Sequence, residues 1–142
     1  MREFLFRGKR VDTGRWIEGS LWYYLGVPKI LSAANVVGYD VHPDSVGQFV
    51  GLTDKNGKKI FEWDVIKFHK FRGEPDWVGV ISYEHSQYVV TGRMPVAYEK
   101  RIGEEPFYCP FEVSLSGIDK DTIRVIGNTH DTPELVRRSE DA

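Results

Sequence analysis

Aromatic and β-branched residues alternate with polar residues along most of the chain, over short stretches that are bounded by turn residues. Such a period of two is typical of β-strands that bury one face. The stretches 16–24, 64–71 and 77–83 show it most clearly. In the first of them the two faces separate into one set with Trp16, Glu18, Ser20 and Trp22 and another with Ile17, Leu21 and Tyr23. The pattern therefore predicts a protein built from short strands.

Turn residues connect these strands into hairpins. Asp12-Thr13-Gly14 separates the apolar stretch 4–6 from 16–24, and Asn56-Gly57 predicts a tight turn in which both residues tolerate a positive φ. Gly19, inside a strand, indicates a bulge or a close backbone approach. The strands 64–71, 77–83 and 87–91 follow one another at about ten-residue spacing, which predicts a meander of the kind found in small barrels.

The C-terminal region changes from a strand to a helix. A strand is expected at 123–128, and the segment 132–138 begins with a capping residue, Thr132 or Asp131, followed by Pro133 at the first helical position. Two arginines close the segment and complement the helix dipole. The predicted fold class is therefore mostly β, with a short C-terminal helix.

Composition limits the class of protein further. The chain has 142 residues, 41% of them hydrophobic, which suits a single domain over residues 1–142. The alternative is an N-terminal β region (residues 1–45) packed on a barrel-like region (residues 46–142). No apolar run approaches the roughly 20 residues that span a bilayer, so we expect no membrane association. A single cysteine, Cys109, and no export signal at the N-terminus predict a cytoplasmic protein.

One stretch suits nucleic acid. Lys67-Phe68-His69-Lys70-Phe71-Arg72 interleaves cations with aromatic rings, and small β-barrels bind single strands with that combination. The candidate binding residues are Lys67, His69, Lys70 and Arg72. Strand alternation, however, puts Phe68 on the same face as Ile66, which is more consistent with a core position. This favours the alternative in which Phe68 is buried and the polar residues form an ordinary solvated face. Nucleic acid is therefore an alternative partner and not the favoured one.

Signals for catalysis and for metals are weak. Glu62 and Asp64 form a carboxylate pair of the type that can act as acid and base, but carboxylates that precede a strand more often bind backbone N–H groups of a turn. The four histidines show neither helical nor paired-cysteine metal spacing. We predict no catalytic residue, no metal site and no cofactor.

Three blocks of sequence, residues 3–9, 46–66 and 126–135, cover both ends and the centre of the chain. In this order they resemble the YopX family of bacteriophage and prophage proteins. The resemblance implies a mostly β fold with an SH3-like barrel or barrels made of antiparallel hairpins, and it implies no known activity. Trp63 stands where the family usually has glycine, so we expect the turn there to be made differently.

These observations lead to an expected function. We expect a phage or prophage protein that is not an enzyme and that acts as a binding or assembly module through protein contacts. Its protein partner is not identified by the sequence, and self-association into a homo-oligomer is one alternative. A nucleic-acid-binding accessory protein and an unrecognised enzyme are the others.

Overall fold

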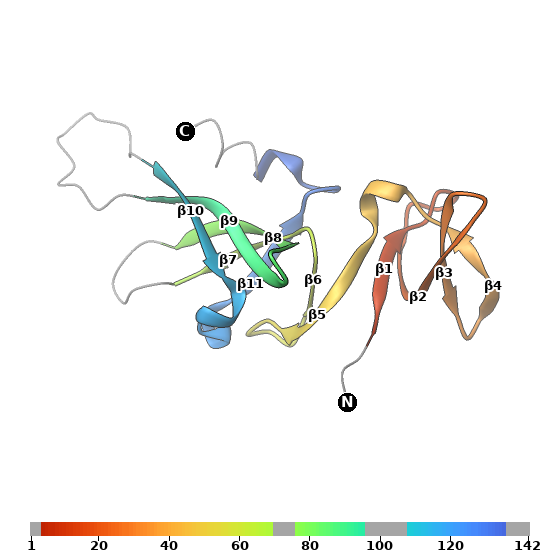
Figure 1. Ribbon diagram of the computed structural model, residues 1–142, viewed down its shortest axis with the longest axis horizontal. Coiled ribbons are helices and arrows are strands. Elements are labelled where there is room, and N and C mark those ends of the chain that lie inside the picture. The colour runs from red at the N-terminus through yellow and green to blue at the C-terminus, as the bar shows by residue number, and fades with distance from the viewer. Residues whose placement is uncertain (1–3, 70–75, 96–107, 136–142) are drawn as a thin grey trace. The chain divides into compact units, whose positions relative to one another are not determined.

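The computed structural model describes residues 4–69, 76–95 and 108–135, and most of these residues lie in β-strands (Figure 1). The described strands form two antiparallel sheets, and helical residues occur near the C-terminus. The predicted mostly-β class is therefore confirmed. The chain divides into two compact units, Met1–Gly51 and Leu52–Ala142.

The first unit is a set of antiparallel hairpins. In the first sheet the strands have the order β4-β3-β2-β1-β5-β6, and β5 begins in the first unit and ends in the second. The first unit also holds a short 3-10 helix, η1, before β5. The strands of the first sheet, together with η1, are β1 (Phe6–Lys9), β2 (Trp16–Tyr24), β3 (Val27–Ser32), β4 (Asn35–Asp40), η1 (Pro43–Ser45), β5 (Gly47–Thr53) and β6 (Lys59–Phe61), of which β6 lies in the second unit.

The register of β2 against β3 decides which side chains of the first unit are buried. Leu21 lies opposite Ile30, and Ile30 is completely buried with Val41. Trp22 lies opposite Lys29 on the other face. Gly19 has no room for a side chain, since a Cβ atom there would lie 1.9 Å from the carbonyl oxygen of Leu31. The close backbone approach predicted at Gly19 is thus confirmed.

The second unit contains the second sheet. Its strands have the order β10-β9-β8-β7-β11, so that four consecutive strands form a meander and the last strand returns beside β7. Two 3-10 helices connect β10 to β11 (Figure 1). The elements are β7 (Asp64–Phe68), β8 (Trp77–Glu84), β9 (Gln87–Pro95), β10 (Tyr108–Ser114), η2 (Leu115–Gly117), η3 (Lys120–Thr122) and β11 (Arg124–Asn128).

An aromatic cluster fills one face of the second sheet. The ring centroids of Phe68 and Phe111 each lie within 6 Å of the Trp77 ring centroid, at 5.9 and 4.9 Å. The cross-strand pair Gly79 and Gly92 leaves the space that the Phe111 ring uses, because a Cβ on Gly79 would lie 3.1 Å from that ring. The buried position predicted for Phe68 is confirmed.

The predicted meander is confirmed, but hydrogen bonds do not close it into a barrel. Among the strands that the structure describes, β10 and β11 are the two ends of the second sheet, and neither sheet has a pairing that joins its ends. The hairpins that the alternating pattern predicts are therefore present in open sheets. Alternation fixes which side chains face the core, whereas closure depends on how far the whole sheet bends.

The conformation of the turn at Asn56-Gly57 differs from the sequence prediction, and paired positive φ angles occur at two turns for which they were not predicted. The turn at Asn56-Gly57 forms, but only Gly57 has a positive φ, of 83°, in a longer loop in which Gly57 N–H donates to the Asp54 carbonyl. Positive φ at two consecutive turn residues occurs instead at Leu25-Gly26 and at His85-Ser86. Neighbouring strand pairs set these turns, so bulky and polar residues are held in a conformation that Asn-Gly would adopt more easily.

The end of the described chain is a helical segment at residues 133–135, and the predicted residues 136–138 lie outside the described residues. Pro133 is the first helical residue and Thr132 directly precedes it, as predicted, with the Leu135 N–H donating to the Thr132 carbonyl. The Thr132 hydroxyl donates to the Asn128 carbonyl and accepts the Asn128 N–H, so it ties the segment back to β11. Gly127 is required there, because a Cβ atom would lie 2.1 Å from the Thr132 hydroxyl oxygen.

Candidate functional site

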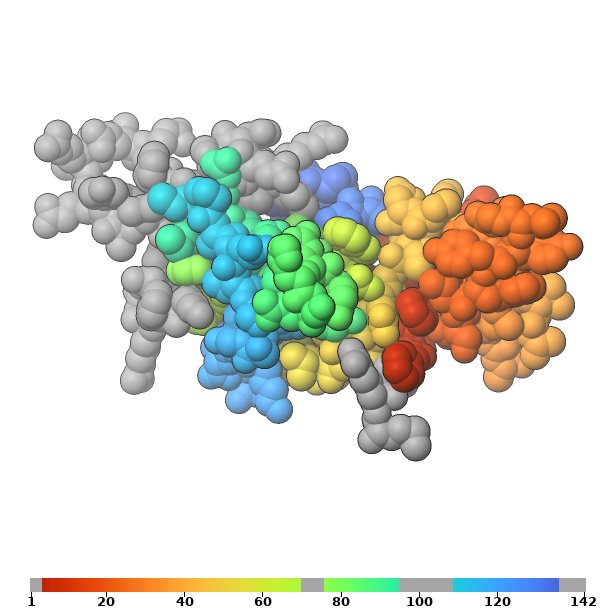
Figure 2. All heavy atoms as spheres, viewed as in Figure 1, coloured from red at the N-terminus to blue at the C-terminus, as the bar shows by residue number. Residues whose placement is uncertain are grey.

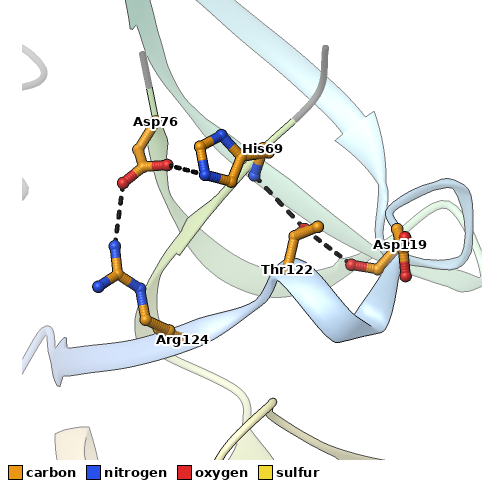
Figure 3. A network of polar contacts seen from close by, with 5 residues as sticks. All are labelled: His69, Asp76, Asp119, Thr122 and Arg124. Atoms are coloured by element: carbon orange, nitrogen blue, oxygen red, sulfur yellow. Dashed lines mark hydrogen bonds and ion pairs between the residues drawn. The ribbon is translucent and has the colours of Figure 1, made fainter. Parts of the chain in front are cut away.

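A polar network joins three strands of the second unit at one end of β7. The Asp76 carboxylate accepts from both neighbours: its Oδ1 lies 3.0 Å from His69 Nε2 and its Oδ2 lies 2.9 Å from Arg124 Nη2 (Figure 3). The His69 backbone N–H donates to the Thr122 hydroxyl at 3.4 Å, and that hydroxyl donates to the Asp119 carbonyl at 2.8 Å. One carboxylate therefore binds an imidazole from the residue that follows β7 and a guanidinium from β11.

The predicted nucleic-acid residues are only partly brought together. Lys67 lies on β7, half-buried, and His69 follows the strand, exposed and engaged with Asp76. Lys70 and Arg72 lie outside the described residues. Asp76 offsets the charge of Arg124, so this ion pair adds no net positive charge beside His69.

Cations instead share a row across the second sheet. Arg124 lies opposite Lys67, Lys67 opposite Val78, and Val78 opposite Arg93. Directly opposed residues in a sheet point to the same face. Lys67, Arg93 and Arg124 therefore lie on the face away from the aromatic cluster. The sequence could not show this row, because the strands it crosses lie far apart along the chain.

Of the carboxylate pair Glu62 and Asp64, Asp64 stabilises the local backbone. Asp64 is 1% exposed and its Oδ2 accepts the Phe61 N–H at 2.8 Å. Asp64 is thus the turn-binding carboxylate that the sequence favoured over a catalytic one. Between the two, Trp63 has φ 71°, so the expectation that the turn is made differently here is wrong: the left-handed conformation is kept with a tryptophan in it.

Hydrogen bonds hold Trp63 in that conformation. Its N–H donates to the Ile81 carbonyl at 2.8 Å, and its own carbonyl accepts the Thr129 N–H at 2.9 Å. A left-handed backbone costs an L-residue with a side chain about 1–2 kcal/mol. These hydrogen bonds, one to β8 and one to the residue that follows β11, therefore offset a local strain, and Trp63 is left 40% exposed.

Asp54 joins the β5–β6 turn to β11. Its Oδ1 accepts the N–H groups of Asn56 and Lys58, and its Oδ2 accepts the Val125 N–H. Burial alone would raise the pKa of Asp54, but these three backbone donors outweigh burial and leave the pKa lowered. The carboxylate is 6% exposed, and these hydrogen bonds are all to backbone groups of the second unit. It is a fold-stabilising group.

Beside Trp63 the outer face of the second sheet is hollowed. The hollow has a volume of about 470 Å³ and lies over β8, β9 and β10. Its floor includes Val80, Ser82 and Thr91, which face away from the aromatic cluster. The complete lining is Trp63, Val80, Ser82, Glu84, Thr91, Gly92, Arg93, Pro110, Phe111 and Thr129.

The first unit carries an exposed apolar surface at the β2–β3 turn. We call it the aromatic tip, and it consists of Trp22, Tyr23, Tyr24, Leu25 and Val27. The exposed fraction is 40% at Trp22 and 87% at Leu25. The rings of Trp22 and Tyr24 lie on the same face, with centroids 5.8 Å apart. In the space-filling view the orange atoms of this region of the chain are at the surface (Figure 2).

Sequence reasoning did not single out the aromatic tip or the hollow. A signal for the tip was present: residues 21–25 are five consecutive apolar residues in a strand that can bury only one face. The hollow had no such signal, since its lining comes from separated strands. Among the residues that the structure describes, no three His, Cys, Asp or Glu side chains are grouped as metal ligands would be.

No described helix is long and apolar enough to cross a bilayer. No curated protein matches the chain. Among solved structures, the crystal structure of protein EF1440 from Enterococcus faecalis is similar over 96% of this chain and 99% of that chain, with 19% identity and a TM-score of 0.49. The model of the YopX protein family matches residues 6–137. That match covers nearly the whole chain and confirms the resemblance found in the sequence, so the chain belongs to the YopX family.

Proposed function

We propose that this protein is a non-enzymatic protein-binding module that docks through the aromatic tip. The observation that supports it is the exposure of the tip: Tyr23, Tyr24 and Leu25 are each more than half exposed. Fully burying one such side chain contributes about 1.5–3 kcal/mol. Aromatic side chains and leucine grouped on a protruding turn suit a partner with an apolar groove.

The same proposal includes where the module acts and the type of fold that it has. The family resemblance implies a bacteriophage or prophage protein, which would act in the cytoplasm of a bacterial host. An SH3-like frame is supported by the order β10-β9-β8-β7-β11, a meander to which the last strand returns. Asp54 and Asp64, both buried, bind backbone N–H groups, which supports a structural role for them and not catalysis.

A photo-crosslinking residue placed at Tyr23 in the bacterial host tests the docking surface. We expect a discrete crosslinked product that disappears when Leu25→Asn is combined with it. The same crosslinker at Val36, which is 76% exposed on β4, is the matched control and should give no such product. Equal crosslinking from both positions, or none from Tyr23, would contradict the proposal.

Nucleic-acid binding is the second candidate, and the cross-strand row of Lys67, Arg93 and Arg124 is the observation that favours it. Phosphate contacts by such cations weaken steeply as salt is added. Gel shifts with single- and double-stranded DNA and RNA should then show binding that Lys67→Ala and Arg93→Ala reduce, together with the slope against salt. Absence of any shift at low salt excludes this candidate.

A further inference from the structure

Two bulky apolar residues of the described chain have a left-handed backbone. They are Leu25, with φ 50°, and Trp63, with φ 71°. The other described residues with positive φ are glycines or the polar pair His85 and Ser86. Backbone strain of this kind persists where the surrounding structure enforces it, and it is concentrated at binding sites. Leu25 lies at the end of the aromatic tip, and Trp63 lines the hollow.

The two surfaces have opposite shapes. The aromatic tip is the end of a hairpin, with Leu25 87% exposed, whereas the hollow is a concave region of a sheet face. A cavity of about 150 Å³ holds a benzene molecule. A hollow of about 470 Å³ therefore has room for the Leu25 side chain and for one of the flanking tyrosine rings.

The two surfaces are also compatible in polarity. Residues 21–27 carry no charge. The hollow contains one acidic and one basic side chain, Glu84 and Arg93, so that it has no net charge to oppose an uncharged tip. Val80 and Pro110 supply apolar side chains to the hollow, whereas the Phe111 ring belongs to the aromatic cluster on the other face; Trp63, which is 40% exposed, lies at its side.

We propose that the aromatic tip of one copy of this chain inserts into the hollow of a second copy. This inference rests on the proposed function and names the partner of the same surface. The chain itself is the favoured occupant because it carries both the protruding and the receiving surface, and both hold a large apolar residue in a strained conformation.

The contact has a defined symmetry. Different surfaces meet, so the contact is heterologous, and an open assembly keeps one unused tip at one end and one unused hollow at the other. Copies therefore join head to tail in rings or open chains. A single tip covers less area than the roughly 1,200 Å² of a standard interface, so the association is weak and depends on concentration.

Sedimentation of the full chain, from roughly 10 µM to 1 mM, measures this association on the affinity scale expected for a weak contact. Leu25→Asn removes the apolar end of the tip, and Trp63→Gly removes the ring from the hollow. Thr91→Arg, which fills the hollow from β9, is a second variant in case Trp63→Gly alters the turn. Val36→Asn is the control for loss of an exposed apolar residue elsewhere. Circular dichroism establishes that each variant is folded.

We expect the average mass of the wild type and of Val36→Asn to rise with concentration. Leu25→Asn and the hollow variants should each stay at the monomer mass. A mixture of Leu25→Asn with a hollow variant keeps one intact tip and one intact hollow, and should therefore form a species of twice the monomer mass and no larger one.

A wild type that is monomeric at every concentration would overturn the inference, as would a mixture that does not form the dimer. The proposed function is tested separately, by the crosslinking experiment. If the wild type is monomeric but the crosslinker at Tyr23 still captures another protein in a Leu25-dependent way, the module docks through its tip and only the identity of the partner is wrong.

Discussion

Replacing Asp54 should cause a large loss of stability, because one carboxylate accepts three backbone N–H groups. The distances to Asn56, Lys58 and Val125 are 2.9, 2.9 and 3.0 Å, and the residue is 6% exposed. Hydrogen bonds to a charged group contribute about 1.5–3 kcal/mol each, but the Asn56 and Lys58 groups lie in a surface turn and can rebind water.

For Asp54→Ala we therefore expect a loss of about 3–4 kcal/mol in the free energy of unfolding, which is a large fraction of the ordinary stability of a domain. Asp54→Asn keeps one acceptor oxygen and should lose about 1–2 kcal/mol. Urea unfolding followed by tryptophan fluorescence measures both values at pH 7. Asp12→Asn is the matched control: Asp12 is exposed and bonded to Arg10, so its loss should change stability far less.

The same carboxylate predicts a pH dependence. The pKa of Asp54 is lowered in the folded chain, so its contribution is fully present above the unfolded value of about 3.9 and is lost as the pH falls through the folded value. The stability difference between wild type and Asp54→Asn should then be constant from pH 7 to pH 5 and should shrink below pH 4. A loss under about 1 kcal/mol for Asp54→Ala, or a difference unchanged at pH 3, would refute this reasoning.

Three further outcomes can be measured by the same urea unfolding. Leu25→Asn should stabilise the monomer by about 1 kcal/mol, because asparagine tolerates φ 50° and Leu25 buries little; a loss of stability would contradict the strain argued for this turn. Gly92→Ala should cost about 3 kcal/mol or more, since its Cβ would lie 2.1 Å from the Val78 carbonyl oxygen, whereas Gly57→Ala meets no atom within 4 Å and should lose only the smaller cost of a positive φ; equal losses would count against this comparison. Asp76→Asn should cost less than about 1 kcal/mol because His69 is exposed and Arg124 is only half-buried, and a loss of several kcal/mol would mean that the network is more deeply buried than its geometry indicates.

The local pattern of the sequence was enough to predict the strands and their faces. The assignment of Trp22 and Leu21 to opposite faces of one strand, and of Phe68 to the core, follows from the period of two alone. Gly19 could be identified as a close approach because a glycine inside a strand is unfavourable unless something occupies its space. These predictions concern neighbours in the chain, for which backbone geometry is decisive.

Turn conformation was less predictable. Asn56-Gly57 favours a tight turn by itself, yet the three contacts of Asp54 set a longer loop there. Leu25 and Trp63 adopt positive φ against their own preference, because hydrogen-bonded strands on either side fix the chain direction. Tertiary contacts outweigh a local preference of about 1–2 kcal/mol.

The order of residues is enough to predict a mostly β chain, the division of its strands into buried and solvated faces, and the family to which it belongs. The folded chain is needed to show which distant residues share a surface: Asp76 with His69 and Arg124, the cations of one cross-strand row, and the lining of the hollow beside Trp63. The physical reason is that register and strand order bring these residues together, and both depend on the packing of the whole sheet and not on any single stretch of sequence.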